Sequence, residues 1–468
     1  MKKNSFLLII IFICLITFFY RLFFPIISID TEVFINNSHE IITSWYAINR
    51  FSLGIIKYLI NGINFNIIFT NIISLSILII ALIIFSKDIF KKENDYFNRL
   101  VLILVVITSP LIAEQFTFTL QIFEISLGYL LLVLNFKLIN GYIYNNKKWS
   151  LPIIVLILAF IFGIYQAFCL LYITLSVIYF IVNRNSKNNN LKEVITIVLK
   201  YIVLFIIGIL LCQLFAIIMK SSLNISGSSY LLKQIGWSTY GLKGILYIGH
   251  YVLTVLFGTR IYYNLGYLIV IILTLIFIKK HWNKQNIILN SSLLFLLITP
   301  FIMSIALGNE TVARSQFSLP FVIGFILIFY KPKNKYYYII PLSLIVFQMI
   351  ITFVLFRNDY LRYNLDLNLM NAINTEISDH EDLPVVFIGE YNNHIKIKGD
   401  VLGNSFFNWD NETENGANIR IHGFFTANNN NYILPSSENI KMAKNNLNQY
   451  NDKINIDNNI IIVNLNKY

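Results

Sequence analysis

Residues 194–219 read VITIVLKYIVLFIIGILLCQLFAIIM, an apolar run with one lysine and no acidic residue. A helix needs about 20 such residues to cross a bilayer. Comparable runs recur along the chain, and the first of them ends at Ile29. The others lie near 64–86, 99–113, 121–139, 151–164, 166–182, 241–258, 264–278, 287–307, 316–330 and 336–356. Of the 468 residues 56% are hydrophobic and 13% are charged, about half the charge of a soluble protein. The sequence therefore predicts a polytopic membrane protein and excludes a soluble enzyme with a single anchor.

Basic residues predict the topology, because lysine and arginine gather in cytoplasmic loops. With the N-terminus inside, the basic loops near 87–99, 137–148, 184–200, 279–284 and 331–335 all fall inside, provided that the run at 241–258 does not span. That run carries Lys243 and His250, and we expect 221–263 to form re-entrant or interfacial helices outside. The result is about eleven transmembrane helices. The net charge of +12 then reflects topology and the lipid bilayer, and we expect no nucleic acid as a partner.

The composition changes near Arg357, where the last long apolar run ends. Residues 357–468 hold 14 of the 24 acidic residues but only 9 of the 36 basic ones. Short segments near 383–389, 405–410, 420–425 and 460–463, with a polar helix at 438–450, predict a small α+β domain. We expect a transmembrane domain over 1–356 and a soluble extracytoplasmic domain over 357–468.

The first outer loop carries the most informative charges. Asp30 and Glu32 lie at the mouth of the first helix, and Trp45 and Arg50 follow within about twenty residues. A carboxylate here could act as a general base, and a guanidinium binds phosphate oxygens in a bidentate manner. The alternative is that both acids only cap and solvate a helix end.

Four further regions offer polar groups near the same face. Pro110 is expected to break a helix just before Glu114, and an acid at membrane depth usually faces a cavity or a partner. Tyr165 and Gln166 form a tight turn that either satisfies a helix break or lines a cavity. Lys233 and Arg314 add positive charge that suits a lipid-linked phosphate. Interfacial anchoring explains these two equally well.

Several signatures of soluble enzymes are missing from the sequence. It has no phosphate-binding P-loop, no dinucleotide fingerprint and no cluster of histidine and cysteine with metal-ligand spacing. No inside loop is long enough for a nucleotide-sugar domain, so a sugar donor would have to be lipid-linked and presented from the outer side.

The chain resembles the bacterial glucosyl transferase II family of serotype-converting membrane enzymes. The resemblance rests on Asp30-Thr31-Glu32, on Trp45, on Asn49-Arg50-Phe51 before a helix, and on Tyr165-Gln166 after a short one. Further matching features are Ser109-Pro110 with Glu114, Arg314 with Pro320, and the tail segments 385–389 and 403–409. One position departs from the pattern, because Asn49 stands where the family leads us to expect glycine.

The resemblance implies a type C glycosyltransferase fold and transfer of glucose, or a related hexose, from undecaprenyl phosphate to a cell-surface polysaccharide. No metal or other cofactor is expected. Asp30 or Glu32 is the candidate base, with a slight preference for Asp30 because it lies nearest the helix end. Arg50, Arg314 and Lys233 would bind the donor phosphate, and Tyr165 and Gln166 would contact sugar hydroxyls.

Two other functions stay open at this point. A transporter or flippase of lipid-linked glycans would also be polytopic and basic. Its sequence would be expected to show internal repeats, and it would need no soluble outer tail. A polysaccharide polymerase or ligase favours a large outer loop in the middle of the chain, whereas the large outer segment here is C-terminal.

Overall fold

The computed structural model describes residues 3–60, 66–92, 95–184, 191–259, 262–263, 265–283, 286–330, 335–378, 382–411, 413 and 415–468. The chain divides into two compact units. The first comprises Met1–Leu22, Ile42–Phe116 and Gln121–Phe353. The second comprises Phe23–Ile41, Thr117–Leu120 and Val354–Tyr468, so the segment with Asp30 and Glu32 belongs to the same unit as the tail.

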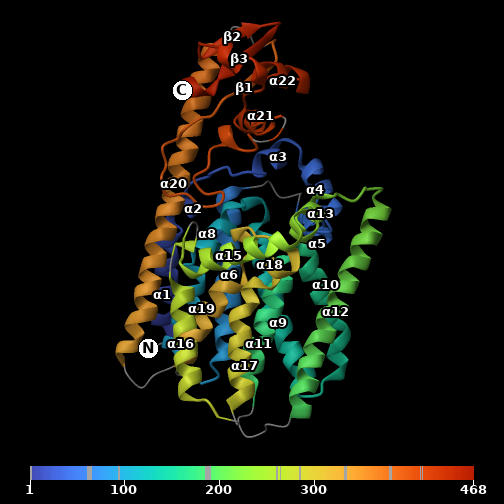
Figure 1. The fold of residues 1–468 in the computed structure, drawn as a ribbon, viewed down its shortest axis with the longest axis vertical. Helices are drawn as coiled ribbons and strands as arrows, with labels where there is room; N and C mark the ends of the chain where they lie inside the picture. Colours follow the sequence, from blue (N-terminus) through green and yellow to red (C-terminus); the bar gives the residue numbers. More distant parts are fainter. Residues whose placement is uncertain are drawn as a thin grey trace. The chain divides into compact units, whose positions relative to one another are not determined.

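The first unit is built from helices (Figure 1). The helices that lie wholly or mainly in it are α1 (Lys3–Thr17), α2 (Phe19–Phe23), α4 (Ser38–Ala47), α5 (Phe51–Ile60), α6 (Ile67–Ile89), α7 (Tyr96–Ile107), α8 (Pro110–Thr117), α9 (Thr119–Tyr144), α10 (Leu151–Ile164), α11 (Ala167–Asn183), α12 (Leu191–Ser222), α13 (Tyr230–Lys233), α14 (Gly236–Tyr240), α15 (Gly244–Leu256), α16 (Gly266–Lys280), α17 (Ile287–Ile298), α18 (Ile302–Leu307) and α19 (Ser318–Phe329). Helix α20 (Ile339–Ile377) runs from this unit into the second.

Five helical stretches of the described chain are long and apolar enough to cross a membrane, as expected of a helical membrane protein. They are 67–89, 119–144, 191–222, 287–307 and 336–377, and α7 with α8 makes a sixth if this bent pair is one span. The bend of 51° lies at Pro110, as the sequence predicts. Helices α1, α5, α10, α11 and α19 are apolar but shorter, so the number of about eleven spans stays a prediction.

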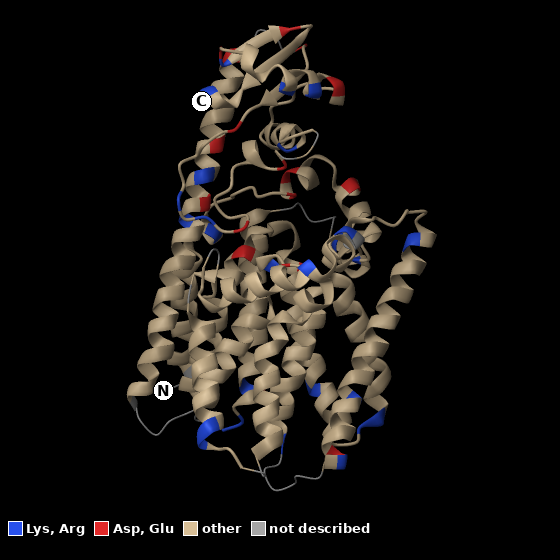
Figure 2. Ribbon diagram, viewed as in Figure 1, with Lys and Arg blue, Asp and Glu red and all other residues tan. Residues whose placement is uncertain are grey.

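The basic loops of the first unit meet at one end of its helices, which we call the basic end. The ring of Phe6 near the start of α1 lies 5.6 Å from that of Tyr96 at the start of α7. Lys91 Nζ donates to Asn183 Oδ1 at 2.9 Å, and Asn183 donates to Asn140 Oδ1 at 3.4 Å. Figure 2 shows lysine and arginine along this end. The loops near 87–99, 137–148 and 184–200 therefore lie on one side, as the topology requires, although 93–94 and 185–190 lie outside the described residues.

The second unit contains α3 (Thr31–Asn36) and a three-stranded sheet with the strand order β1-β3-β2. Strand β1 (Val385–Ile388) pairs in parallel with β3 (Ile460–Asn464), and β2 (Ile454–Asp457) pairs with β3 in an antiparallel manner. Helices α21 (Asn418–Ala427) and α22 (Ser437–Asn445) pack beside β1. The segment 420–425 thus lies in a helix, and the expected polar helix at 438–450 ends earlier, at Asn445.

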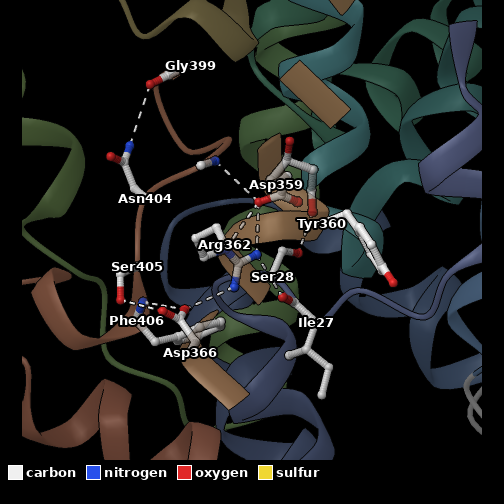
Figure 3. A network of polar contacts seen from close by, with 12 residues as sticks. Ile27, Ser28, Asp359, Tyr360, Arg362, Asp366, Gly399, Asn404, Ser405 and Phe406 are labelled. Carbon is white, nitrogen blue, oxygen red and sulfur yellow. Dashed lines mark hydrogen bonds and ion pairs between the residues drawn. The ribbon is translucent and has the colours of Figure 1, made fainter. Parts of the chain in front are cut away.

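A buried charged network ties the segment before α3 to α20 (Figure 3). Arg362 donates from Nη2 to Asp359 Oδ1 at 2.9 Å and pairs through Nη1 with Asp366 Oδ2 at 3.4 Å. The same Nη2 donates to the backbone oxygen of Ile27 at 3.2 Å. Because Ile27 lies three residues before Asp30, this arginine fixes the backbone that leads into the acidic segment.

Candidate functional site

Asp30 and Glu32 begin α3 in different environments. Asp30 has a φ of 68°, a left-handed conformation that aspartate tolerates better than most residues. Its side chain is 27% exposed, whereas that of Glu32, in the first turn, is fully buried. The two carboxyl groups therefore differ in access to solvent although they stand two residues apart.

Arg420, on α21, joins both acids. Its Nη1 lies 3.1 Å from Asp30 Oδ1 and 2.8 Å from Glu32 Oε1, and its Nε lies 3.0 Å from Asp410 Oδ2. Three carboxylates thus share one guanidinium. The sequence interpretation missed Arg420 and Asp410, because Arg420 lies 388 residues from Glu32 and no local pattern marks such a pair.

The packing of α3 on α21 explains how these groups meet. Gly423 lies one turn beyond Arg420, and a Cβ atom there would stand 3.0 Å from Glu32 Cγ. Asn36 Nδ2 donates to the backbone oxygen of Gly423 at 3.0 Å. A glycine at this crossing lets the two short helices approach closely enough for the ion pairs to form.

Burial dominates the electrostatics of Glu32. Desolvation raises the pKa of Glu32 to about 7, the neighbouring charge of Arg420 opposes this rise, and Asp30 adds to it. Glu32 Oε2 has no hydrogen-bond partner within the described ranges of the chain. A carboxyl group with a pKa near neutrality can take up and release a proton under physiological conditions, as a general base requires.

In the first unit, Arg50 forms a second cluster with Tyr165 and Gln166. Arg50 Nε donates to Gln166 Oε1 at 3.2 Å, and the guanidinium carbon lies 4.4 Å from the centre of the Tyr165 ring. Gln166 Nε2 donates to the backbone oxygen of Ile48 at 3.0 Å. The backbone oxygen of Trp45, whose side chain is buried, accepts a hydrogen bond from the Arg50 backbone N–H at 2.8 Å. Three of the residues that the sequence singles out, Trp45, Tyr165 and Gln166, therefore contact Arg50, and the last two orient its guanidinium.

Asn49 occupies the position where glycine was expected, and its conformation explains the departure. Its φ is 65°, in the left-handed region that glycine adopts freely and asparagine tolerates. Its side chain accepts a hydrogen bond from Lys220 Nζ at 2.8 Å and donates to Gln213 Oε1 at 3.3 Å. Asparagine thus keeps the turn and adds contacts to α12 that glycine cannot make.

The remaining candidates lie on other elements of the first unit. Glu114 is fully buried on α8, Lys233 is an exposed residue at the end of α13, and Arg314 is half-buried in a 3₁₀ turn (Ala313–Ser315). A buried ion pair that the sequence interpretation missed joins Lys57 on α5 to Glu124 on α9 at 2.8 Å. Helical periodicity offers the only sequence signal for Lys57, which lies two turns after Arg50.

Comparison with known proteins identifies the family. The family model described as glucosyl transferase GtrII matches residues 19–330, two-thirds of the chain. The chain belongs to the glucosyl transferase GtrII family. Neither the curated proteins nor the solved structures contain a match. The family supports a glycosyltransferase activity, and the matched region includes both Asp30-Thr31-Glu32 and the Arg50 cluster, whereas Arg420 lies outside it.

Within the described ranges, no group of three or more histidine, cysteine, aspartate or glutamate side chains is placed to hold a metal ion.

Proposed function

We propose that this GtrII protein transfers glucose, or a related hexose, from undecaprenyl phosphate to a cell-surface polysaccharide at the outer face of the membrane. The observation that best supports the proposal is the pair Asp30 and Glu32, within the family match, with the pKa of Glu32 near 7. In this reaction the acceptor hydroxyl oxygen forms a bond to the anomeric carbon. The bond from that carbon to the phosphate oxygen breaks, and the lipid phosphate leaves with the electron pair.

One of the two acids takes the proton of the acceptor hydroxyl. Asp30 is the better placed to meet an acceptor, because its carboxylate is partly exposed. Glu32 has a pKa raised by burial to about 7, and a base works best when its pKa lies near the working pH. Whichever of the two contacts the acceptor is the catalytic residue, and the other tunes its charge.

Arg50 is proposed to bind the donor phosphate. Its guanidinium is held against Tyr165 by a cation–π contact and oriented by Gln166. A planar cation fixed in this way can bind phosphate oxygens in a bidentate manner and stabilise the charge that develops as the phosphate leaves. Lysine cannot reproduce this geometry, so Arg50→Lys should retain the charge and lose most of the transfer.

The test compares Asp30→Asn and Glu32→Gln with the parent, each purified in detergent and supplied with undecaprenyl-phosphoglucose and a crude surface glycan. The measurement is the release of undecaprenyl phosphate. We expect replacement of the base to reduce the rate by at least about a hundredfold, with the protein still folded. Glu40→Gln, at an exposed acid on α4, is the matched control.

Three results would contradict the proposal. If both acid variants keep the parental rate, neither acid is the base. If the parent transfers no lipid-linked sugar yet moves one across liposomes, the protein is a transporter. If the parent releases its lipid carrier only when a lipid-linked oligosaccharide replaces undecaprenyl-phosphoglucose as donor, the protein is a polymerase or ligase.

A further inference from the structure

A polar cavity of about 610 Å³ lies at the basic end of the first unit. It is bordered by the ends of α6, α9 and α11 and by the segment after α6. The charged residues among those that line it are Lys87, Asp88, Lys91 and Lys137. This cavity contains none of the residues of the two clusters described above.

The described lining of this cavity carries an excess of positive charge. Asp88 is the acid in the lining, and it is already engaged by Lys137 Nζ at 3.8 Å and by the hydroxyl of Tyr179 at 3.3 Å. Lys91 Nζ donates to Asn183 Oδ1 at 2.9 Å, which holds its ammonium beside the cavity. Three ammonium groups against one carboxylate favour an anion, and a phosphate group offers the oxygens that lysines and amides can bind.

An apolar cavity of about 560 Å³ shares helix α11 with the polar cavity. It is bordered by α11, α12 and α17, and its lining includes Phe180, Val198 and Phe295. Tyr201 on α12 lines this apolar cavity, while its hydroxyl lies 3.5 Å from Oδ1 of Asn140, which lines the polar one. On α11, Tyr179 faces the polar cavity and Phe180 the apolar one. The polar cavity, with its excess of lysine, and the apolar cavity are therefore neighbours.

We propose that the two cavities together bind an anionic lipid, with its phosphate-bearing headgroup among Lys87, Lys91 and Lys137 and an acyl chain along α11, α12 and α17. The adjoining apolar cavity is the reason to choose a lipid over a soluble phosphate ester. Basic pockets between transmembrane helices on the cytoplasmic side bind such headgroups, and the positive-inside rule places the basic end there. This lipid site does not depend on the proposed transfer reaction.

The test measures lipid binding to the purified, delipidated full chain by native mass spectrometry. The probes are phosphatidylglycerol, zwitterionic phosphatidylcholine with the same acyl chains, and soluble glycerol phosphate. We expect phosphatidylglycerol to bind at least about tenfold more tightly than either of the other two. Each charge-assisted contact is worth about a factor of ten, so Lys87→Gln with Lys91→Gln should weaken its binding about a hundredfold.

Two further variants separate the headgroup from the chain. Val198→Trp fills the apolar cavity and should weaken phosphatidylglycerol binding without changing the thermal stability, because Val198 is 41% exposed. Lys148→Gln, an exposed lysine outside the cavity, should change nothing.

Equal binding of phosphatidylglycerol by the parent and the double lysine variant would overturn the proposal. So would glycerol phosphate binding as tightly as the lipid. Neither result bears on sugar transfer, so this inference and the proposed function can fail separately.

Discussion

Replacing Glu32 by glutamine should change how the stability of the protein depends on pH. The Glu32 side chain is fully buried, and burial raises its pKa from an ordinary 4.5 to about 7. The folded state therefore binds the proton more tightly than the unfolded state. As the pH rises between these two values, the unfolded chain releases its proton first, and the free energy of unfolding falls.

The magnitude follows from the size of this shift. One pKa unit corresponds to about 1.4 kcal/mol, so the full effect is about 3 kcal/mol, of which about 2.5 kcal/mol develops between pH 5 and pH 8. Glu32→Gln carries no such proton, and Arg420 keeps Asp30 and Asp410 as partners in the variant.

Equilibrium unfolding of the full chain in mixed micelles, measured at both pH values, tests this reasoning. The stability of the variant relative to the parent should increase by about 2.5 kcal/mol from about pH 5 to about pH 8. Glu40→Gln, at an exposed carboxyl group, should track the parent throughout. Parallel curves for the parent and Glu32→Gln would mean that Glu32 titrates near its ordinary value, and the argument from burial would be refuted.

Four further substitutions have expected outcomes. Arg420→Gln removes the charge that lowers the pKa of Glu32, so the pH at which transfer reaches half its maximum should rise by at least about one unit, with partial rescue by Arg420→Lys. Asn49→Gly should keep its left-handed turn and most of its stability, whereas Asn49→Val should lose about 1–2 kcal/mol in unfolding measurements. Gly163→Ala places a Cβ atom 2.3 Å from the Phe51 ring and should cost about 1–3 kcal/mol by the same measurement. Arg362→Met leaves two buried aspartates without their cation and should cost about 3–5 kcal/mol, seen as earlier unfolding and faster proteolysis.

Local sequence patterns predicted much of the helical architecture. The apolar run at 194–219 forms α12, which extends by only a few residues at each end. Helix α7 ends at Ile107, and Pro110 begins α8, a position where its missing N–H is tolerated. The Arg50 cluster was also predictable, because its members lie in two segments that both end at the same face of the expected topology.

Contacts between distant segments were not predictable in this way. Arg420 lies in a segment with weak periodicity, and its position beside Glu32 depends on the packing of Gly423 against α3. An apolar run also does not fix the length of its helix, because apolar helices such as α5 and α19 are shorter than a bilayer requires. Sequence periodicity describes one element at a time, whereas the contact between Arg420 and Glu32 depends on two helices that lie far apart in the sequence.

The arrangement around Arg420 explains why a proton should be held at this site near neutral pH. If Asp30, Glu32 and Asp410 were all ionised, one guanidinium would face three negative charges. Burial raises the pKa of Glu32, whose side chain has no access to water, and so favours its neutral form. Arg420 limits this rise in the pKa of Glu32, and it lies on α21, outside the residues that match the family model. The charge state of Glu32 therefore depends on a part of the chain that the GtrII family model does not cover. Glu32 and Arg420 therefore have to be replaced together, as in Glu32→Gln combined with Arg420→Gln. Comparison of this double variant with each single variant separates the loss of a proton acceptor from the loss of charge balance.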